Sequence, residues 1–187
     1  MSATVWITGL PAAGKTTLAA AVRAELTRRG VVVCVLDGDE LRRGLSSDLG
    51  LSRGDRAEQA RRAAHVAALV AQAGVVAVVA LVSPYADDRH AARELHDAKG
   101  IPFVEVWIDT PLAVCQQRDP KGLYARARNG ELTGLTGIDE PYEPPTHPSL
   151  RIAGDRQDPQ VAASKIAAVL GYGPGEPEVG SGPVRSL

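Results

Sequence analysis

The residues with the clearest chemical purpose form one stretch near the start of the chain, Gly9-Leu10-Pro11-Ala12-Ala13-Gly14-Lys15-Thr16-Thr17. Its spacing, G-x-x-x-x-G-K-T, lies between a β-branched run and a long amphipathic run, which is the context of a phosphate-binding P-loop. Glycine at both ends permits backbone conformations that a Cβ would block, so the loop N–H groups and the following helix N-terminus can surround phosphates. The pattern predicts that Lys15 reaches the β- and γ-phosphates of a nucleotide and that the Thr16 hydroxyl binds Mg²⁺.

Two further carboxylates follow the next apolar run. Residues 31–36 are apolar and mostly β-branched, as expected for a strand buried on both faces of a parallel sheet, and the run ends in Asp37-Gly38-Asp39. Ligands of open α/β sheets bind at the carboxyl edge of the strands. At that edge Asp39 could orient an acceptor hydroxyl or hold a water on Mg²⁺, and its alternative role is to cap a helix.

Regular alternation of strand and helix patterns positions these groups. Strands are expected at 4–7, 31–36, 75–82, 103–108 and 150–153, and helices at 18–29, 55–73, 87–99, 111–118 and 158–170, with a short helix and loop at 41–53. Asp55 is the expected N-cap of the second long helix. This alternation predicts an α/β fold, a three-layer sandwich with helices on both faces of a five-stranded parallel sheet. The pattern alone leaves the strand order open.

Two segments depart from this alternation. Residues 119–148 are rich in Gly, Pro, Arg and Asp and show no sustained period. A segment of this kind inside a compact domain is usually functional or disordered, and we expect a mobile lid over an active site. From residue 171 onward Gly, Pro and Ser dominate. The sequence therefore predicts one domain at 1–170 and a disordered tail at 171–187.

Composition excludes several classes of partner. The net charge of −1 gives no electrostatic footprint for nucleic acid or anionic lipid. The longest apolar run, 75–82, is too short to span a bilayer. The chain enters its first strand almost at once and shows no signal peptide, so we expect a cytoplasmic protein. Its two cysteines, Cys34 and Cys115, have no metal or disulfide spacing.

With these residues placed, the chain resembles the adenylylsulfate (APS) kinase family over about residues 4–170. The resemblance rests on the P-loop and on ordered motifs: Asp37-Gly38-Asp39 with Arg42, Asp55-Arg56, Ser83-Pro84-Tyr85, Arg118-Asp119-Pro120-Lys121-Gly122-Leu123-Tyr124, and Thr136-Gly137-Ile138-Asp139. A P-loop alone is unspecific, whereas the last two motifs at this separation are highly specific. The resemblance implies a kinase that uses MgATP to phosphorylate the 3′-hydroxyl of APS, giving PAPS. It also implies a sheet order of 2-3-1-4-5 and a homodimer.

The resemblance assigns residues to three roles. Phosphoryl transfer depends on positioning and charge neutralisation, which the resemblance gives to the catalytic residues Lys15, Asp39 and Lys121. ATP is expected to contact Gly9, Ala12, Ala13, Gly14, Lys15, Thr16, Thr17 and Arg118. The small-molecule nucleotide acceptor is expected to contact Asp37, Asp39, Arg42, Leu51, Arg56, Gln59, Val82, Ser83, Lys121, Leu135 and Thr136. Mg²⁺ is expected on Thr16, with Asp39 acting through a water.

Several residues of this acceptor set depart from the family pattern. Leu51 and Leu135 stand where the family has phenylalanines that sandwich the acceptor base, Gln59 replaces an asparagine, and Ala86 replaces an arginine. Stacking is worth roughly 1–3 kcal/mol per base, and leucine lacks the π-face. The alternative to APS is therefore another nucleotide-like hydroxyl, for example of a cytidine diphosphate-type compound. A second alternative is a non-catalytic nucleotide-binding regulatory protein, against which the retained Asp39 and Lys121 argue.

Overall fold

One parallel sheet forms the centre of the molecule. The computed structural model describes residues 2–173. Residues 174–187, which make up most of the expected tail, lie outside the described residues. Within the described part the strands are β1 (Thr4–Thr8), β2 (Val33–Asp37), β3 (Val76–Ala80), β4 (Phe103–Ile108) and β5 (Leu150–Ile152). They pair in parallel in the order β2-β3-β1-β4-β5, which confirms the order that the family resemblance implied.

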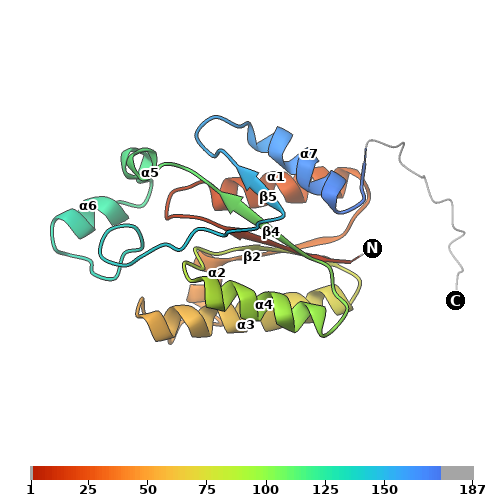
Figure 1. Cartoon of the computed structure of the whole chain (residues 1–187), viewed down its shortest axis with the longest axis horizontal. Helices are drawn as coiled ribbons and strands as arrows, with labels where there is room; N and C mark the ends of the chain where they lie inside the picture. Colours follow the sequence, from red (N-terminus) through yellow and green to blue (C-terminus); the bar gives the residue numbers. More distant parts are fainter. Residues whose placement is uncertain (1, 174–187) are drawn as a thin grey trace, which may run out of the picture.

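Helices cover both faces of this sheet. Their bounds are α1 (Lys15–Arg28), α2 (Gly38–Arg43), α3 (Arg53–Gln72), α4 (Ala86–Asp97), α5 (Leu112–Arg118), α6 (Leu123–Arg128) and α7 (Pro159–Val169). Helices α1 and α7 lie on one face and α3 and α4 on the other, while α5 and α6 lie at the end to which β4 and β5 point (Figure 1). Within residues 2–173, no helix combines the length and the apolar character that a membrane crossing needs.

The central strand β1 separates two hydrophobic cores. Val5 and Ile7 are fully buried in the core beneath α1 and α7, whereas Trp6 packs into the core beneath α3 and α4. The α3 side of the second core is built from alanines at helical spacing, including Ala60, Ala63, Ala64 and Ala67. Small side chains at these positions allow the helix to approach the sheet closely. This packing holds the carboxyl ends of β1 and β3 in fixed positions.

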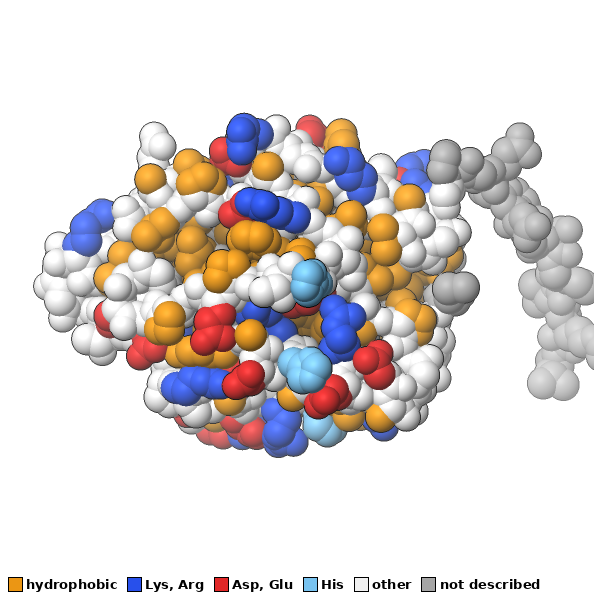
Figure 2. All heavy atoms as spheres, in the orientation of Figure 1, with side chains coloured by type: hydrophobic (Ala, Val, Ile, Leu, Met, Phe, Trp, Pro, Cys, Tyr) orange, Lys and Arg blue, Asp and Glu red, His pale blue; other side chains and the backbone are white. Residues whose placement is uncertain are grey.

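Strand β2 is less buried than its sequence suggested. It occupies the edge of the sheet, and Val33, Cys34 and Val35 are only half-buried. Both faces are nevertheless covered as expected, because Val33 and Val35 pack against the core beneath α1 and Cys34 packs against the core beneath α3. A β-branched run indicates a strand, but its place in the sheet depends on pairing with β3, which the run does not encode. On the surface over α3 and α4, positively and negatively charged side chains are interspersed (Figure 2), in keeping with the net charge of −1.

Helix ends follow local hydrogen-bonding chemistry. Helix α3 begins after Ser52, whose side chain accepts from the Asp55 N–H (3.2 Å), while the Asp55 carboxylate accepts from the Ser52 N–H (3.3 Å). This capping box corrects the expectation that Asp55 itself is the N-cap. Helix α7 begins as expected, since the Asp158 carboxylate accepts from the Gln160 N–H (2.7 Å).

The expected lid is largely anchored. Residues 119–148 contain α6, which the absence of a period did not indicate, and an isolated bridge between Thr136 and Glu140. Tyr124 is fully buried in the core beneath α1, and Leu135 joins the same core. The segment therefore contributes to the hydrophobic core at several points along its length.

Candidate functional site

A cavity of about 980 Å³ opens at the carboxyl edge of the sheet. It lies between the P-loop, α2, the loop after β3, the start of the expected lid, and the loop that joins β5 to α7. Most of the residues selected from the sequence line it: Ala12, Ala13, Gly14, Lys15, Thr16, Thr17, Asp37, Asp39, Arg42, Gln59, Val82, Arg118 and Lys121. The fold thus brings residues expected to contact ATP and residues expected to contact the acceptor to one cavity.

The P-loop uses glycine where the backbone requires it. Gly9 has a φ of 155°, and a Cβ there would lie 2.8 Å from the Ile108 carbonyl oxygen. Gly14, the N-cap of α1, has a φ of 110°. Ala12 adopts the left-handed region as well, with a φ of 59°. Consequently the N-terminus of a 14-residue helix faces the cavity, where its N–H groups favour an anion.

The Lys15 side chain folds back onto the P-loop. Its Nζ donates to the carbonyl oxygens of Gly9 (3.0 Å) and Leu10 (2.7 Å). Desolvation in the wall of the cavity lowers the pKa of Lys15 to about 8, a change that nearby carboxylates only partly offset. The loop carbonyls are neutral and do not balance the positive charge of this ammonium group. An anion that enters the cavity would balance it and so stabilise the charged form.

Thr16 pairs with a different carboxylate from the one expected. Its hydroxyl donates to Asp37 Oδ2 (2.7 Å), while Asp37 Oδ1 accepts from the Asp39 N–H (2.9 Å) and caps α2. The carboxylate beside the Thr16 hydroxyl is therefore that of Asp37, while the expected role of Asp39 through a metal-bound water stays a prediction. No group of three or more His, Cys, Asp or Glu residues that could hold a metal occurs within residues 2–173. One hydroxyl and one carboxylate suit Mg²⁺, which keeps several waters and binds phosphate oxygens.

Asp39 instead meets Lys121. The Lys121 ammonium donates to Asp39 Oδ2, forming an ion pair between the start of α2 and the lid segment. The two side chains are 53% and 54% exposed, so the pair stands in the open part of the cavity and not in its wall. A carboxylate and an ammonium group are thereby placed together in the cavity that the P-loop lines.

Residues on both sides of Lys121 fix its position. The Asp119 carboxylate accepts from the N–H groups of Tyr124 (3.2 Å) and Ala125 (2.9 Å), in the first turn of α6. The buried Tyr124 hydroxyl donates to the Pro11 carbonyl oxygen (3.0 Å), within the P-loop. Tyr124 also lines the cavity and was not singled out from the sequence, although it ends the motif that contains Lys121.

Arg118 joins the P-loop to the loop after β5. Its guanidinium donates to the carbonyl oxygens of Gly154 (2.8 Å) and Ala13 (3.4 Å). The loop residues Gly154, Asp155, Arg156, Gln157, Asp158 and Pro159 also line the cavity and were missed. Their position after the carboxyl end of a strand is a signal that could have found them.

Two arginines on the acceptor side hold backbone carbonyls. Arg42 donates to Leu49 (3.2 Å) and Gly50 (2.8 Å), and Arg56 donates to Leu51 (3.0 Å) and Gly134 (2.6 Å). Burial lowers the pKa of both groups, and for Arg56 the neighbouring Arg42 lowers it further. Two cations that repel each other create a positive potential attractive to an anionic acceptor.

A small second hollow, of about 20 Å³, adjoins these groups. Arg56, Gln59, Val82 and Ser83 are among the residues that line it. Gln59 Nε2 donates to the Gly38 carbonyl oxygen (3.2 Å). Ser83 has a φ of 34°, and its hydroxyl accepts from Trp6 Nε1 (3.0 Å). The loop after β3 therefore forms part of the wall on this side.

Three expected acceptor contacts lie away from both hollows. Leu135 is 3% exposed and packs in the core, and Thr136 is fully buried. Leu51 is half-buried, and its Cβ lies 3.5 Å from the position that a Cβ on Gly134 would take. The pair Leu51 and Leu135 does not form an open sandwich in this structure, because the core already takes up the Leu135 side chain.

The sheet order, the P-loop after the central strand and the lysine-bearing segment over the same cavity define the class of P-loop kinases. The family model for adenylylsulphate kinase matches residues 1–153. The chain belongs to the adenylylsulfate kinase family, as its motifs indicated.

Individual relatives agree with this placement. The adenylyl-sulfate kinase of Paraburkholderia xenovorans is 49% identical over 168 residues, which are 90% of this chain and 92% of the relative. The bifunctional enzyme CysN/CysC of Mycobacterium tuberculosis is 50% identical over 163 residues, which are 87% of this chain and 26% of that enzyme. The chain thus spans about a quarter of the length of these bifunctional relatives.

Solved structures show the same fold. The structure of the Mycobacterium tuberculosis APS kinase CysC in complex with AMPPNP and APS matches with a TM-score of 0.88 at 47% identity. The match covers 91% of this chain and 98% of that one. The family and the fold class predicted from the sequence are both confirmed.

Proposed function

We propose that this chain transfers the γ-phosphoryl group of ATP to the 3′-hydroxyl of APS, giving PAPS. The observation that carries the proposal is the convergence of Lys15, Asp39 and Lys121 on one cavity. The 47% identity to an APS kinase solved with AMPPNP and APS supports it. The P-loop alone does not specify the reaction, since many nucleotide-binding proteins with different activities contain one.

The phosphates of ATP bind at the P-loop in this proposal. The N-terminus of α1 and the Lys15 ammonium neutralise the β- and γ-phosphates, and Arg118 lies toward the base. Thr16 and Asp37 are the residues that would hold Mg²⁺, which supplies neutralisation of the phosphate charge. Lys15 then exchanges its contacts with the loop carbonyls for contacts with phosphate oxygens.

Asp39 and Lys121 serve the transfer itself. The acceptor oxygen forms a bond to the γ-phosphorus, the bond from that phosphorus to the β–γ bridging oxygen breaks, and ADP leaves. Asp39 accepts the hydroxyl proton, and the Lys121 ammonium stabilises the charge on the moving phosphoryl group. Arg42 and Arg56 bind the anionic groups of the acceptor and release the backbone carbonyls that they hold.

A different acceptor is the second candidate function. Among the described residues Tyr124 is the only aromatic side chain that lines the large cavity, and its hydroxyl is committed to the P-loop. Leu135 is buried, and Gln59 is one methylene longer than the family asparagine. These features favour an acceptor that does not depend on stacking between two rings, such as a cytidine diphosphate-type compound.

Release of ADP from MgATP decides between these functions. The acceptor panel is APS, adenosine diphosphate, cytidine diphosphate-type compounds and no acceptor, with Lys15→Ala as the background control. Turnover at low micromolar APS supports the proposal. Turnover with another nucleotide but not with APS assigns the second function. If no acceptor gives ADP release in protein that still binds ATP, the alternative of a non-catalytic regulatory protein is favoured.

The family resemblance also predicts a homodimer, and the sequence without a signal peptide predicts a cytoplasmic location. Light scattering of the purified chain tests the first of these, and a monomer at micromolar concentration contradicts it.

A further inference from the structure

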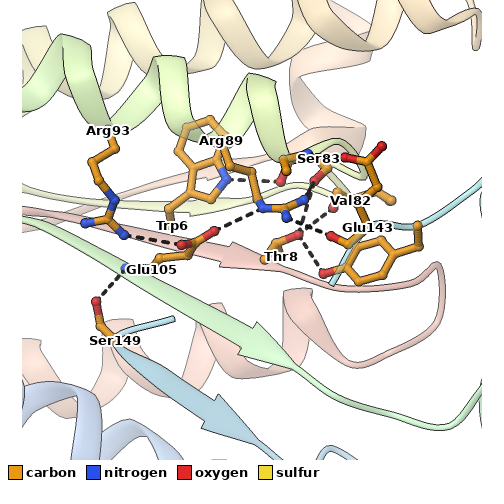
Figure 3. A network of polar contacts seen from close by, with 11 residues as sticks. Trp6, Thr8, Val82, Ser83, Arg89, Arg93, Glu105, Glu143 and Ser149 are labelled. Atoms are coloured by element: carbon orange, nitrogen blue, oxygen red, sulfur yellow. Dashed lines mark hydrogen bonds and ion pairs between the residues drawn. The ribbon is translucent and has the colours of Figure 1, made fainter. Parts of the chain in front are cut away.

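A buried arginine lies behind the acceptor side of the cavity. Arg89, on α4, is 3% exposed, and its three guanidinium nitrogens contact three different parts of the chain (Figure 3). It donates to Glu105 Oε1 (3.0 Å) on β4, to the Ser83 carbonyl oxygen (2.8 Å) and to the Glu143 carbonyl oxygen (2.7 Å). The proposed reaction gives this residue no role.

The first of the segments it holds is the strained loop after β3. Ser83 is one of the few non-glycine residues with a positive φ, 34°, and such a conformation persists only where its surroundings impose it. Thr8, next to the P-loop, donates to the Val82 carbonyl oxygen (2.6 Å), and Trp6 donates to the Ser83 hydroxyl (3.0 Å). Val82 lines the large cavity. The loop therefore connects β1 to the acceptor side.

The second segment is residues 140–143, here called the strap. The Glu143 N–H donates to the Pro84 carbonyl oxygen (2.8 Å), and Glu143 Oε2 accepts from the Ala86 N–H (2.7 Å). The Tyr85 hydroxyl donates to Glu140 Oε2 (2.8 Å). With the Arg89 contact, the strap is fastened along its length to the residues that follow Ser83.

Charge and shape explain why this group is an arginine. Its planar fork can serve three acceptors at once, which a lysine ammonium at the same place cannot do in the same geometry. Glu105 balances the buried charge, and its second oxygen accepts from Arg93 (3.2 Å), which is 31% exposed. Arg93 shares Glu105 with Arg89, and it also donates to the Phe103 carbonyl oxygen (3.3 Å) and lies over the Phe103 ring, 4.9 Å from its centroid.

We propose that Arg89 is a positioning residue for the acceptor, because it ties the Val82–Ser83 loop, which forms a wall of the acceptor side, to the strap. This inference rests on the proposed kinase function. The wall adjoins Arg56 and Gln59 across the small hollow, so movement of the loop alters the space that the acceptor occupies. The P-loop contacts of Lys15 and Arg118 lie elsewhere and do not involve Arg89.

Kinetics with APS test the consequence for the acceptor. Arg89→Lys keeps the charge but loses the fork, and we expect the KM for APS to rise by about tenfold or more, since small misplacements are costly. The Kd for MgADP should stay within about twofold. Arg93→Gln is the matched control, because it removes a partner of the same Glu105, and it should leave the KM within about twofold.

Hydrogen exchange tests the positioning itself and needs no turnover. In Arg89→Lys we expect faster exchange in peptides covering 82–86 and 138–146, with α1 unchanged, and no such change in Arg93→Gln. Glu143→Ala is a second variant, which frees the exposed side-chain anchor of the strap and leaves the buried pair intact. It should act in the same direction on exchange and on KM.

The outcomes separate the two proposals. Unchanged exchange at 82–86 and 138–146 in both Arg89→Lys and Glu143→Ala overturns the positioning role, as does an equal change in Arg93→Gln. Wild-type protein that is silent with APS overturns the proposed function, while the exchange comparison still decides the role of Arg89. A rise in the MgADP Kd equal to the rise in KM would mark a general loss of structure.

Discussion

Lys121 and Asp39 are separated by 82 positions in the chain and form an ion pair across the open part of the cavity. Their contact places the lysine-bearing segment directly over the start of α2. Because both side chains are about half exposed, the pair exchanges readily with water, and an incoming substrate can take either partner. The contact is therefore suited to hold the site together before the substrates arrive and to yield when they do.

Asp39→Asn should separate catalysis from nucleotide binding. The amide keeps the size of the side chain but cannot take the acceptor proton, so kcat should fall by about 10²–10⁴. The Kd for MgADP should change by less than about threefold. Glu40→Gln is the control, since Glu40 is exposed and pairs with Arg43. Equal losses in kcat and in nucleotide affinity would instead make Asp39 a nucleotide or metal ligand.

Lys15→Ala should abolish turnover and leave the fold intact. The variant removes the ammonium that faces the β- and γ-phosphates, and a loss of about 10³ or more in kcat is expected. Circular dichroism and thermal melting should match the wild type. Lys99→Ala, at an exposed site after α4, provides the comparison. Near-normal activity in Lys15→Ala would contradict the P-loop assignment.

The lowered pKa of Lys15 should appear in nucleotide affinity. Free enzyme loses the ammonium proton as the pH rises through about 8, below the ordinary value of 10.5, whereas bound phosphates favour the charged form. The Kd for MgADP should therefore rise by about tenfold between pH 7 and pH 9. Calorimetric titration across this range measures it, with circular dichroism at pH 9 as the check on folding. A flat profile would be inconsistent with a desolvated Lys15.

Gly154→Ala should destabilise the protein. An added Cβ would lie 2.2 Å from Thr110 Oγ1, 2.5 Å from Ile108 Cγ2 and 2.9 Å from the Ala13 carbonyl oxygen. Relief of these contacts should cost about 1–3 kcal/mol in the free energy of unfolding, measured by urea denaturation. Gly44→Ala is the control, because nothing lies within 4 Å of its added Cβ. The same loss in both variants would remove the packing explanation.

His96 should make stability fall in mild acid. Its Nδ1 faces the Ala92 carbonyl oxygen (2.7 Å), its Nε2 is buried without a partner, and desolvation lowers its pKa below 6.5. The unfolded chain binds this proton more readily, so the free energy of unfolding should drop as the pH falls below about 6.5, by up to about 1.4 kcal/mol per unit. His96→Leu should flatten this slope between pH 5 and 7. His90→Gln, at an exposed position, should retain it.

Local chemistry made the sheet and the P-loop predictable. The run containing Val5 and Ile7 alternates into the core beneath α1. In the P-loop, a Cβ at Gly9 would be too close to the Ile108 carbonyl oxygen, and Gly14 has a positive φ of 110°. The helix at 123–128 was missed because α6 is short and is held by Tyr124 packing and not by its own periodicity. Sequence spacing cannot show which buried pocket a single side chain fills.

Site residues that belong to a sequence motif could be predicted. Contacts that depend on how distant segments pack against each other could not. Lys15 and Lys121 reach the cavity from motifs that place them there. The hydrogen-bond partner of Thr16 is set by how β2 meets α1, which a sequence pattern does not record, so the contact between Thr16 and Asp37 was not predicted. The burial of Leu135 likewise follows from packing between segments far apart in the chain.

The hydrogen bond from Tyr124 to Pro11 has a mechanical consequence. It makes α6 and the P-loop a single body, so any closing movement must turn at a point beyond α6. Gly130 and Gly134, with φ values of 73° and 75°, are the backbone positions best able to act as that pivot. Residues 131–148 line neither of the two hollows, so a movement of this part of the chain would leave the P-loop and α6 in place.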